Sequence, residues 1–229
     1  MNLLKKLFVI FFTTVTISSC SFGGNDLAMA SDEGMEKIKE LVKANINTEE
    51  CKIYSLEWSE DSRDHKLENI LSEIDVKYID KENNDYDLTI NYTDGKFIPE
   101  EPQKRESIRY SYKYTTPFDL NLLNAEEIIK KISAGGELVA AQEDGEQYEF
   151  KSVGKYEFYI TPVLKKYEQH WEDWNDEKKK DYYTVQQSFE LNFVKKDEQP
   201  EVKGRKVWTN YYAIPFAMNE KGNVEIKQY

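Results

Sequence analysis

Alternation of apolar and polar residues is the feature that most constrains what this chain can fold into. In residues 86–92 large apolar side chains occupy every second position, and within 182–194 the apolar residues Val185, Phe189, Leu191 and Phe193 alternate with polar ones. A period of two indicates strands that bury one face and expose the other, as in antiparallel sheets. Further runs of strand character are found in residues 51–58, 74–78, 108–114, 148–150, 156–160, 207–218 and 224–226. We therefore predict that sheet dominates the fold.

Three stretches have helical spacing instead. The first covers about residues 33–45, a short second helix is expected after Asp64, and a third follows Asn124, which has the position of an N-terminal cap. Gly135-Gly136 is expected to stop the third helix. The apolar positions of the second are Leu67, Ile70, Leu71 and Ile74. The three expected helices and the strands together predict an α+β protein in which helices pack on one face of an antiparallel sheet.

Residues 99–107 contain two prolines and several charged residues, and they are the most linker-like internal stretch. They divide the chain into an N-terminal half, 32–100, and a C-terminal half, 107–229. In each half a helix is expected before a run of antiparallel strands, so the two halves could be similar units. This arrangement resembles cystatin-like or NTF2-like sheets, a likeness of fold that implies no function.

The first 20 residues have the features of an export signal. Lys5 and Lys6 precede an apolar stretch of about eleven residues, which is too short to span a bilayer, and Ser18-Ser19-Cys20 follows. Ile17-Ser18-Ser19-Cys20 resembles the lipobox of bacterial lipoproteins, although Ile17 and Ser19 differ from the commonest choices. An uncleaved anchor and an ordinary leader are the alternatives.

The resemblance implies a cell-envelope protein that is cleaved after residue 19 and lipidated on Cys20. Its partner would then be the lipid bilayer, reached through the acylated cysteine. Residues 20–31, with Gly23-Gly24, are expected to form a short tether. Ser21 follows the cysteine where aspartate would retain an enterobacterial lipoprotein at the inner membrane, so an outer-membrane destination is expected in a host with two membranes.

The charge of the chain narrows the kinds of partner. The whole sequence has a net charge of −12, and the two lysines are the only charged residues of 1–19, so removal of the leader deepens it to −14. This balance disfavours nucleic acid, whose phosphates require clustered Lys and Arg. A basic protein is the more plausible partner.

Candidate catalytic residues are few. The sequence has two histidines, His65 and His170, and no zinc-binding, nucleotide-binding or serine-hydrolase motif, so we predict no metal and no cofactor. His170 lies beside acids and two tryptophans, Trp171 and Trp174, and could act as a general base, but packing of a half-buried histidine with these rings is favoured. Cys51 is expected to be a small buried residue of a strand.

Aromatic residues supply the remaining candidates for binding. Tyr110, Tyr112 and Tyr114 alternate within one expected strand and would share a face, where exposed rings could contact a partner. A core position for these rings is favoured. Residues 162–174 fit a helical stripe somewhat better than a prolonged strand.

Two functions follow from these observations. The first is a lipid-anchored envelope protein with a non-catalytic binding or assembly role, including that of an inhibitor or immunity protein. The alternative is an envelope hydrolase, or a carbohydrate-processing or carbohydrate-binding protein, that uses the region from His170 to Trp174.

Overall fold

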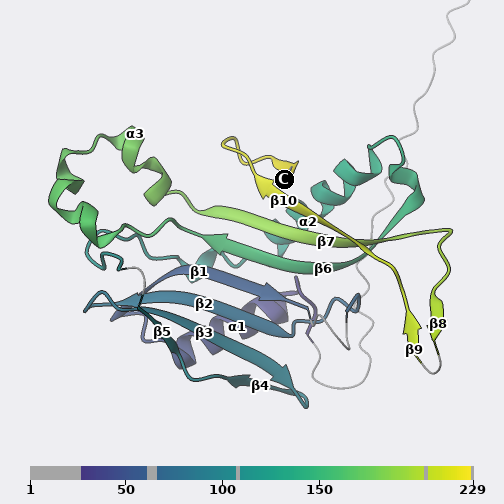
Figure 1. Ribbon diagram of the computed structural model, residues 1–229, viewed down its shortest axis with the longest axis horizontal. Coiled ribbons are helices and arrows are strands. Elements are labelled where there is room, and N and C mark those ends of the chain that lie inside the picture. Colours follow the sequence, from purple (N-terminus) through teal and green to yellow (C-terminus); the bar gives the residue numbers. More distant parts are fainter. Residues whose placement is uncertain (1–26, 61–65, 107–108, 204–205, 228–229) are drawn as a thin grey trace, which may run out of the picture.

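The computed structural model describes residues 27–60, 66–106, 109–203 and 206–227 (Figure 1). Cys20 and the rest of the predicted signal segment lie outside the described residues. The helices are α1 (Asp32–Asn45), α2 (Ala125–Ala140) and α3 (Asp176–Lys179), with 3-10 turns at Leu120–Leu122, Gly145–Gln147, Lys165–Asp173 and Lys180–Tyr182. The strands are β1 (Cys51–Ser59), β2 (Glu73–Asp80), β3 (Asp85–Thr93), β4 (Lys96–Pro99), β5 (Gln103–Arg105), β6 (Tyr148–Tyr159), β7 (Gln186–Lys195), β8 (Glu201–Lys203), β9 (Lys206–Trp208), β10 (Tyr212–Met218) and β11 (Val224–Ile226).

Nine strands form one antiparallel sheet, which confirms the predicted α+β class. Eight of them are arranged in the order β11-β10-β7-β6-β1-β2-β3-β4, and β5 also pairs with β3. The strands β8 and β9 form a separate hairpin. Helix α1 precedes β1 to β4 in the chain, and α2 precedes β6, β7, β10 and β11. The first long strands after the two helices, β1 and β6, pair with each other at the centre of the sheet.

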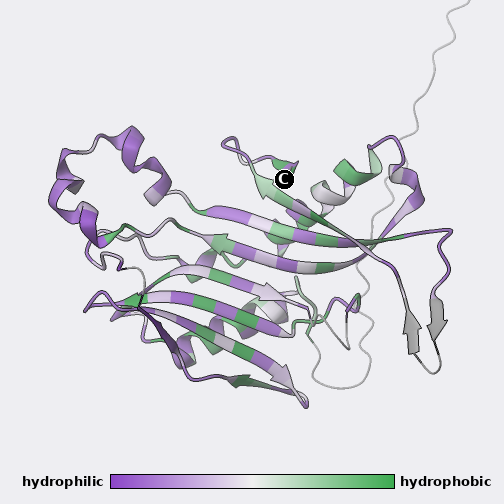
Figure 2. Cartoon of the chain, in the orientation of Figure 1, coloured by the Kyte–Doolittle hydropathy of each residue, from purple (hydrophilic) through white to green (hydrophobic). Residues whose placement is uncertain are grey.

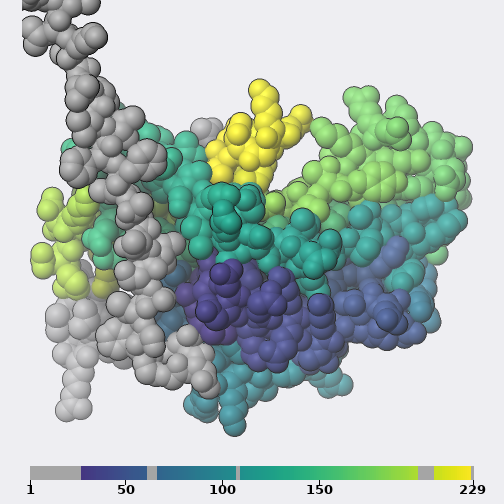
Figure 3. Space-filling model, turned by 180° about the vertical axis from the view of Figure 1, so that it is seen from behind, coloured from purple at the N-terminus to yellow at the C-terminus, as the bar shows by residue number. Residues whose placement is uncertain are grey.

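Helices α1 and α2 cover the same face of the sheet, as the view from behind shows (Figure 3). Beneath them, aromatic rings from four neighbouring strands stack in a row. The ring centroids of Trp58 and Tyr156 are 5.0 Å apart, those of Tyr156 and Phe189 5.4 Å, and those of Phe189 and Phe216 5.0 Å. The strand register places these four residues directly opposite one another. Such cross-strand pairs and the burial of their area stabilise the sheet.

Helix α2 begins at the predicted cap, where Asn124 Oδ1 accepts a hydrogen bond from the Glu127 backbone N–H at 3.0 Å. The predicted stop at Gly135-Gly136 is wrong, because the helix continues to Ala140. A Cβ on residue 135 would lie 3.0 Å from the Phe189 ring. Gly135 therefore allows α2 to approach the sheet closely instead of ending the helix.

The expected helix after Asp64 is absent from the described residues 66–74. Leu67 and Asn69 have positive φ angles of 71° and 59°, which no right-handed helix contains. The Leu71 N–H donates to Leu27 O at 2.8 Å, so this segment pairs with the chain just before α1. Met29 in the same stretch is fully buried. Residues 27–31, expected as the end of the tether, are consequently part of the fold.

Two other expected segments differ from the structure. Within the expected strand 108–114, residues 112–114 form a turn, in which the Tyr114 N–H donates to Ser111 Oγ and the Thr115 N–H donates to Ser111 O. The expected linker 99–107 contains β5, which pairs with β3. Antiparallel hairpins join β2 to β3 around Asn83-Asn84 and β10 to β11 around residues 219–223.

Between β6 and β7 the chain leaves the sheet and forms a projecting arm, residues 161–185, which contains α3 (Figure 1). The helical preference predicted for residues 162–174 is partly correct, because Lys165–Asp173 has 3-10 geometry. The arm is largely hydrophilic, whereas the strands alternate between apolar and polar residues (Figure 2).

Candidate functional site

The face of the sheet opposite α1 and α2 is polar and is open over its central strands. It is the face toward the viewer in Figure 1, where no described helix crosses β1, β2, β6 or β7. The strand register aligns its side chains in three rows across the strands β7, β6, β1, β2 and β3. These rows are Gln186–Tyr159–Ser55–Lys77–Asp87, Ser188–Glu157–Glu57–Asp75–Thr89, and Glu190–Lys155–Ser59–Glu73–Asn91. We call this surface the open face.

Carboxylates dominate the open face. The middle row places Glu157, Glu57 and Asp75 side by side on three adjacent strands. Hydroxyl groups at the ends of the row partly satisfy them: Ser188 Oγ donates to Glu157 at 3.2 Å, and Thr89 Oγ1 donates to Asp75 at 2.5 Å. Like charges directly opposite each other in a sheet are destabilising. Repulsion among the three carboxylates therefore lowers the stability of the fold unless another interaction compensates for it.

Two acids of the open face, Glu57 and Glu73, have raised pKa values. Burial raises the pKa of Glu57 above its ordinary value, and the charges of Glu157 and Asp75 raise it further, while Lys155 opposes the shift. Burial also raises the pKa of Glu73, and the neighbouring Asp75 adds to that shift through its charge and a hydrogen bond. Lys155 Nζ lies 3.5 Å from Glu57 Oε2, so it compensates only part of the negative charge.

A buried polar cluster borders the open face at one end of the strands. The Tyr54 hydroxyl donates to Asp85 Oδ1 at 2.7 Å, and burial raises the pKa of both groups. Arg105 Nε lies 3.6 Å from a carboxylate oxygen of Asp85 and of Asp87. Tyr110 covers this cluster, with its ring centroid 5.4 Å from that of Tyr54. Tyr110 thus closes the border of the open face.

A second buried polar cluster lies at the other end. Glu60, which is 3% exposed, accepts hydrogen bonds from Ser152 Oγ at 2.8 Å and from Asn192 Nδ2 at 2.6 Å. Lys66 Nζ lies 3.3 Å from the same carboxylate. The charge of Glu60 is thereby compensated by partners within the fold, whereas the acids between the two clusters are only partly buried.

The three tyrosines proposed as a binding surface do not share a face. Tyr110 packs on Tyr54, and Tyr112 lies beneath Lys52, whose Nζ is 4.8 Å from the ring centroid. Tyr114 instead joins the arm, 5.6 Å from Trp171 between ring centroids. The turn at residues 112–114 separates them, because it breaks the alternation of a strand.

The region from His170 to Trp174 forms the aromatic centre of the arm. Trp171 is 3% exposed, and Trp174 packs on it at 5.2 Å between ring centroids while Lys178 Nζ lies 3.8 Å from the Trp174 ring. His170 is exposed, not half-buried, with 64% of its side-chain surface accessible, and its Nδ1 is 3.9 Å from Asp173 Oδ2. This separation is longer than a hydrogen bond, so Asp173 does not fix the orientation of the imidazole.

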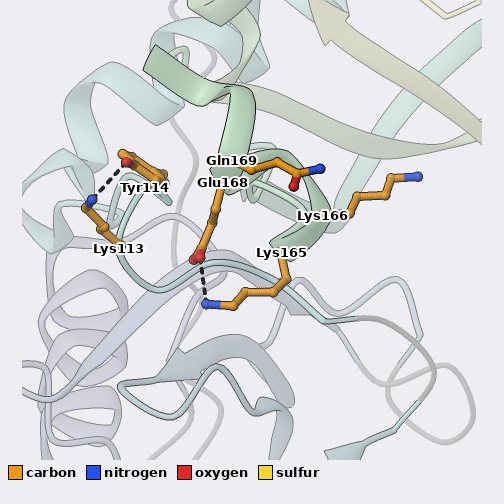
Figure 4. Close-up of a pocket in the computed structure, with 6 residues that line it drawn as sticks. All are labelled: Lys113, Tyr114, Lys165, Lys166, Glu168 and Gln169. Carbon is orange, nitrogen blue, oxygen red and sulfur yellow. Dashed lines mark hydrogen bonds and ion pairs between the residues drawn. The ribbon is translucent and has the colours of Figure 1, made fainter. Parts of the chain in front are cut away.

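A shallow hollow of about 460 Å³ lies where the arm meets residues 113 and 114 (Figure 4). Lys113 Nζ bonds to the Tyr114 hydroxyl at 2.8 Å, and Lys165 Nζ pairs with Glu168 at 2.7 Å. The Ser111 hydroxyl also donates to Glu168. The polar groups of the hollow are therefore largely directed at one another.

No group of three or more acidic, histidine or cysteine side chains suited to a metal ion occurs within the described ranges. Over the same residues, no helix has the length and apolar character needed to cross a membrane. No family model matches the chain, and neither a curated protein nor a solved structure is significantly similar to it.

Sequence reasoning missed the open face. The acidic residues of β1, β2 and β6 alternate with apolar ones, which identifies their side of each strand. Which acids become neighbours depends on the pairing of β1 with both β2 and β6. The pairing with β6 joins residues about 100 positions apart, and no local pattern specifies it.

Proposed function

We propose that this protein is a non-catalytic binding protein of the bacterial envelope, whose open face binds the basic surface of a partner protein. The observation that carries the proposal is the row Glu157–Glu57–Asp75 on three adjacent strands of a sheet face that no described helix covers. A partner that places Lys or Arg side chains over this row would relieve the repulsion among the carboxylates. Binding would then recover free energy that the isolated fold loses.

The rigidity of the sheet favours this role. The backbone that carries the carboxylates is held by strand pairing and by the stacked rings on the other face, so little backbone freedom remains to be lost on binding. The overall charge of −12 would also attract a basic partner at long range and accelerate association. Inhibition of a basic hydrolase or toxin at the envelope is a role of this kind.

We also propose that the two halves, 32–100 and 107–229, are similar units joined edge to edge. Supporting this, each half supplies one helix and then strands that continue outward from the centre of the sheet. Joining two such units doubles the width of the open face, and the central row takes acids from both, Glu157 from one half and Glu57 and Asp75 from the other.

The proposed location is the cell envelope, with the domain held at a membrane by lipid on Cys20. Replacement of Cys20 by serine should abolish incorporation of an alkynyl fatty acid during growth, because the thiol is the expected attachment point. The Cys51→Ser variant is the matched control and should retain the label. Continued labelling of the Cys20→Ser protein would refute the anchor, whatever the open face binds.

The open face is tested with a defined basic probe, a decalysine peptide, by calorimetry at low salt. The triple variant Glu57→Gln, Asp75→Asn and Glu157→Gln should bind it about tenfold more weakly, since each exposed charge contact contributes up to about 1 kcal/mol. The control variant Glu33→Gln, Glu137→Gln and Glu143→Gln removes the same charge from exposed positions on or beside α1 and α2. It should change the affinity less than twofold. Equal weakening by both variants would mean that net charge alone binds the peptide.

A further inference from the structure

The strand β11 forms one edge of the sheet, and its backbone is arranged for further pairing. The Lys227 N–H donates to Pro215 O, and the Asn219 N–H donates to Asn223 O, each at 2.9 Å. Because antiparallel ladders alternate between bonded and non-bonded pairs, the backbone groups of Val224 and Ile226 point away from β10. Within the described residues, no strand pairs with this side of β11.

The opposite edge of the sheet is different. The strand β4 ends in Pro99, which has no N–H, and begins with Lys96, and both residue types protect an edge from pairing. Residues Val224–Ile226 contain neither. Beside β11 lies a groove of about 700 Å³ whose apolar lining includes Leu138, Met218, Val224 and Ile226.

From this edge we infer that the chain forms a two-fold dimer in which β11 pairs antiparallel with β11 of a second copy. When the helices of both copies lie on the same side of the joined sheet, Val224 and Ile226, whose backbone groups point away from β10, can each lie opposite themselves or opposite each other. This gives three registers. Val224 opposite Ile226 would set Glu225 against Glu225 of the other copy. Val224 opposite itself would set Lys227 against Lys221. Ile226 opposite itself sets Glu225 against Lys227 in both directions.

Charge therefore selects the register centred on Ile226. Glu225 and Lys227 are exposed, and no carboxylate of the described residues forms an ion pair with Lys227. Glu225 accepts one hydrogen bond, from Asn219 Nδ2, which leaves its second oxygen available. In the same register the two Ile226 side chains meet on the helix side, next to the apolar groove. Opposite charges and an apolar pair are the contacts that stabilise neighbouring strands.

Disulfide cross-linking of the full chain in intact cells tests the register. In a Cys51→Ser background, Ile226→Cys should give a covalent dimer on oxidation with copper phenanthroline, because directly opposed residues lie about 5.5 Å apart between Cα atoms. Val224→Cys, on the same strand and face, is the matched control. Its two copies would be four residue positions apart, about 14 Å, and should not cross-link. Cross-linking of both variants, or of neither, would overturn the proposal.

Charge exchange provides a second test that leaves the fold intact, because both side chains are exposed. Glu225→Lys and Lys227→Glu should each reduce the Ile226→Cys cross-linking yield and weaken the dimer about tenfold in analytical ultracentrifugation. The double variant should restore both. If all charge variants dimerise like the parent, or if the parent sediments as a monomer at the highest soluble concentration, the pairing is refuted. Neither experiment involves the open face or its partner.

Discussion

The two faces of the sheet use the same strand register in opposite ways. On the covered face the register stacks Trp58, Tyr156 and Phe189, and two helices bury these rings. Glu57, the residue before Trp58 in β1, lies on the open face, where the same strand pairing places it between Glu157 and Asp75. The covered face therefore stabilises the fold enough to tolerate an unfavourable arrangement on the other side. Natural proteins accept such losses where a surface serves binding.

Among the substitutions that compare the two faces, Trp58→Ala should lower the free energy of unfolding most. Trp58 is 1% exposed, stacks on Tyr156 and donates from Nε1 to Met29 O at 2.8 Å. Loss of a buried aromatic side chain costs about 3–5 kcal/mol, and urea denaturation would measure it. The neighbouring Glu57→Ala, on the open face, should cost nothing or stabilise the protein. If Trp58→Ala lowers the free energy of unfolding by less than about 1 kcal/mol, the stacked rings are not a main source of stability.

The close approach of α2 gives the next largest effect. Gly135→Val should destabilise the protein by about 1–3 kcal/mol, because its side chain would meet Phe189 and Leu191 in a filled space. A Cβ on Gly136 would meet nothing within 4 Å, so Gly136→Ala should stabilise the helix by up to about 1 kcal/mol. Thermal unfolding of the two variants measures the difference. Destabilisation by Gly136→Ala would contradict the described packing of α2.

These two glycines also show how far the sequence predicts the structure. The period of two predicted most of the strands and the α+β class correctly, because each strand buries one face. The Gly135-Gly136 pair has the composition of a helix stop, and only its distance from Phe189 explains why the helix continues. The segment near Leu67 has helical spacing, but pairing with Leu27 prevails over it. In both segments tertiary contacts, not the local sequence pattern, determine the structure.

The same distinction explains the candidate site. The sequence drew attention to Tyr110, Tyr112 and Tyr114 because they are conspicuous and evenly spaced. A turn held by Ser111, a residue without a conspicuous signal, sends them to three different surroundings. The acids of the open face are unremarkable in the sequence because acidic residues are abundant, 43 in all. Long-range strand pairing alone makes three of them neighbours.

The acids of the open face should give a smaller, pH-dependent effect. A carboxyl whose pKa is raised on folding costs no stability below its ordinary pKa, near 4.5. The cost grows as the pH rises from that value to the raised pKa and is constant above it. The double variant Glu57→Gln and Glu73→Gln removes this cost. It should match the parent at pH 4 and exceed its unfolding free energy by about 1 kcal/mol at pH 7. Urea denaturation across this range measures the difference, and an equal effect at both pH values would contradict the pKa shifts.

Lys155→Gln should have a smaller effect than the variants above, and its comparison with Lys130→Gln is the most specific test of the open face. Lys155 Nζ is 3.5 Å from Glu57 Oε2, and Lys130 Nζ on α2 is 2.8 Å from Glu127 Oε1, so distance alone favours the helix pair. Each exposed pair contributes about 0.2–1 kcal/mol. The environment reverses the order: Glu57, the partner of Lys155, is partly buried in a row of like charges, whereas Lys130 and its partners Glu126 and Glu127 are exposed. Lys155→Gln should therefore destabilise more than Lys130→Gln and raise the pKa of Glu57, measured by carboxyl NMR titration. If the Glu57 titration is unchanged, the carboxylates of the open face do not act as a coupled row.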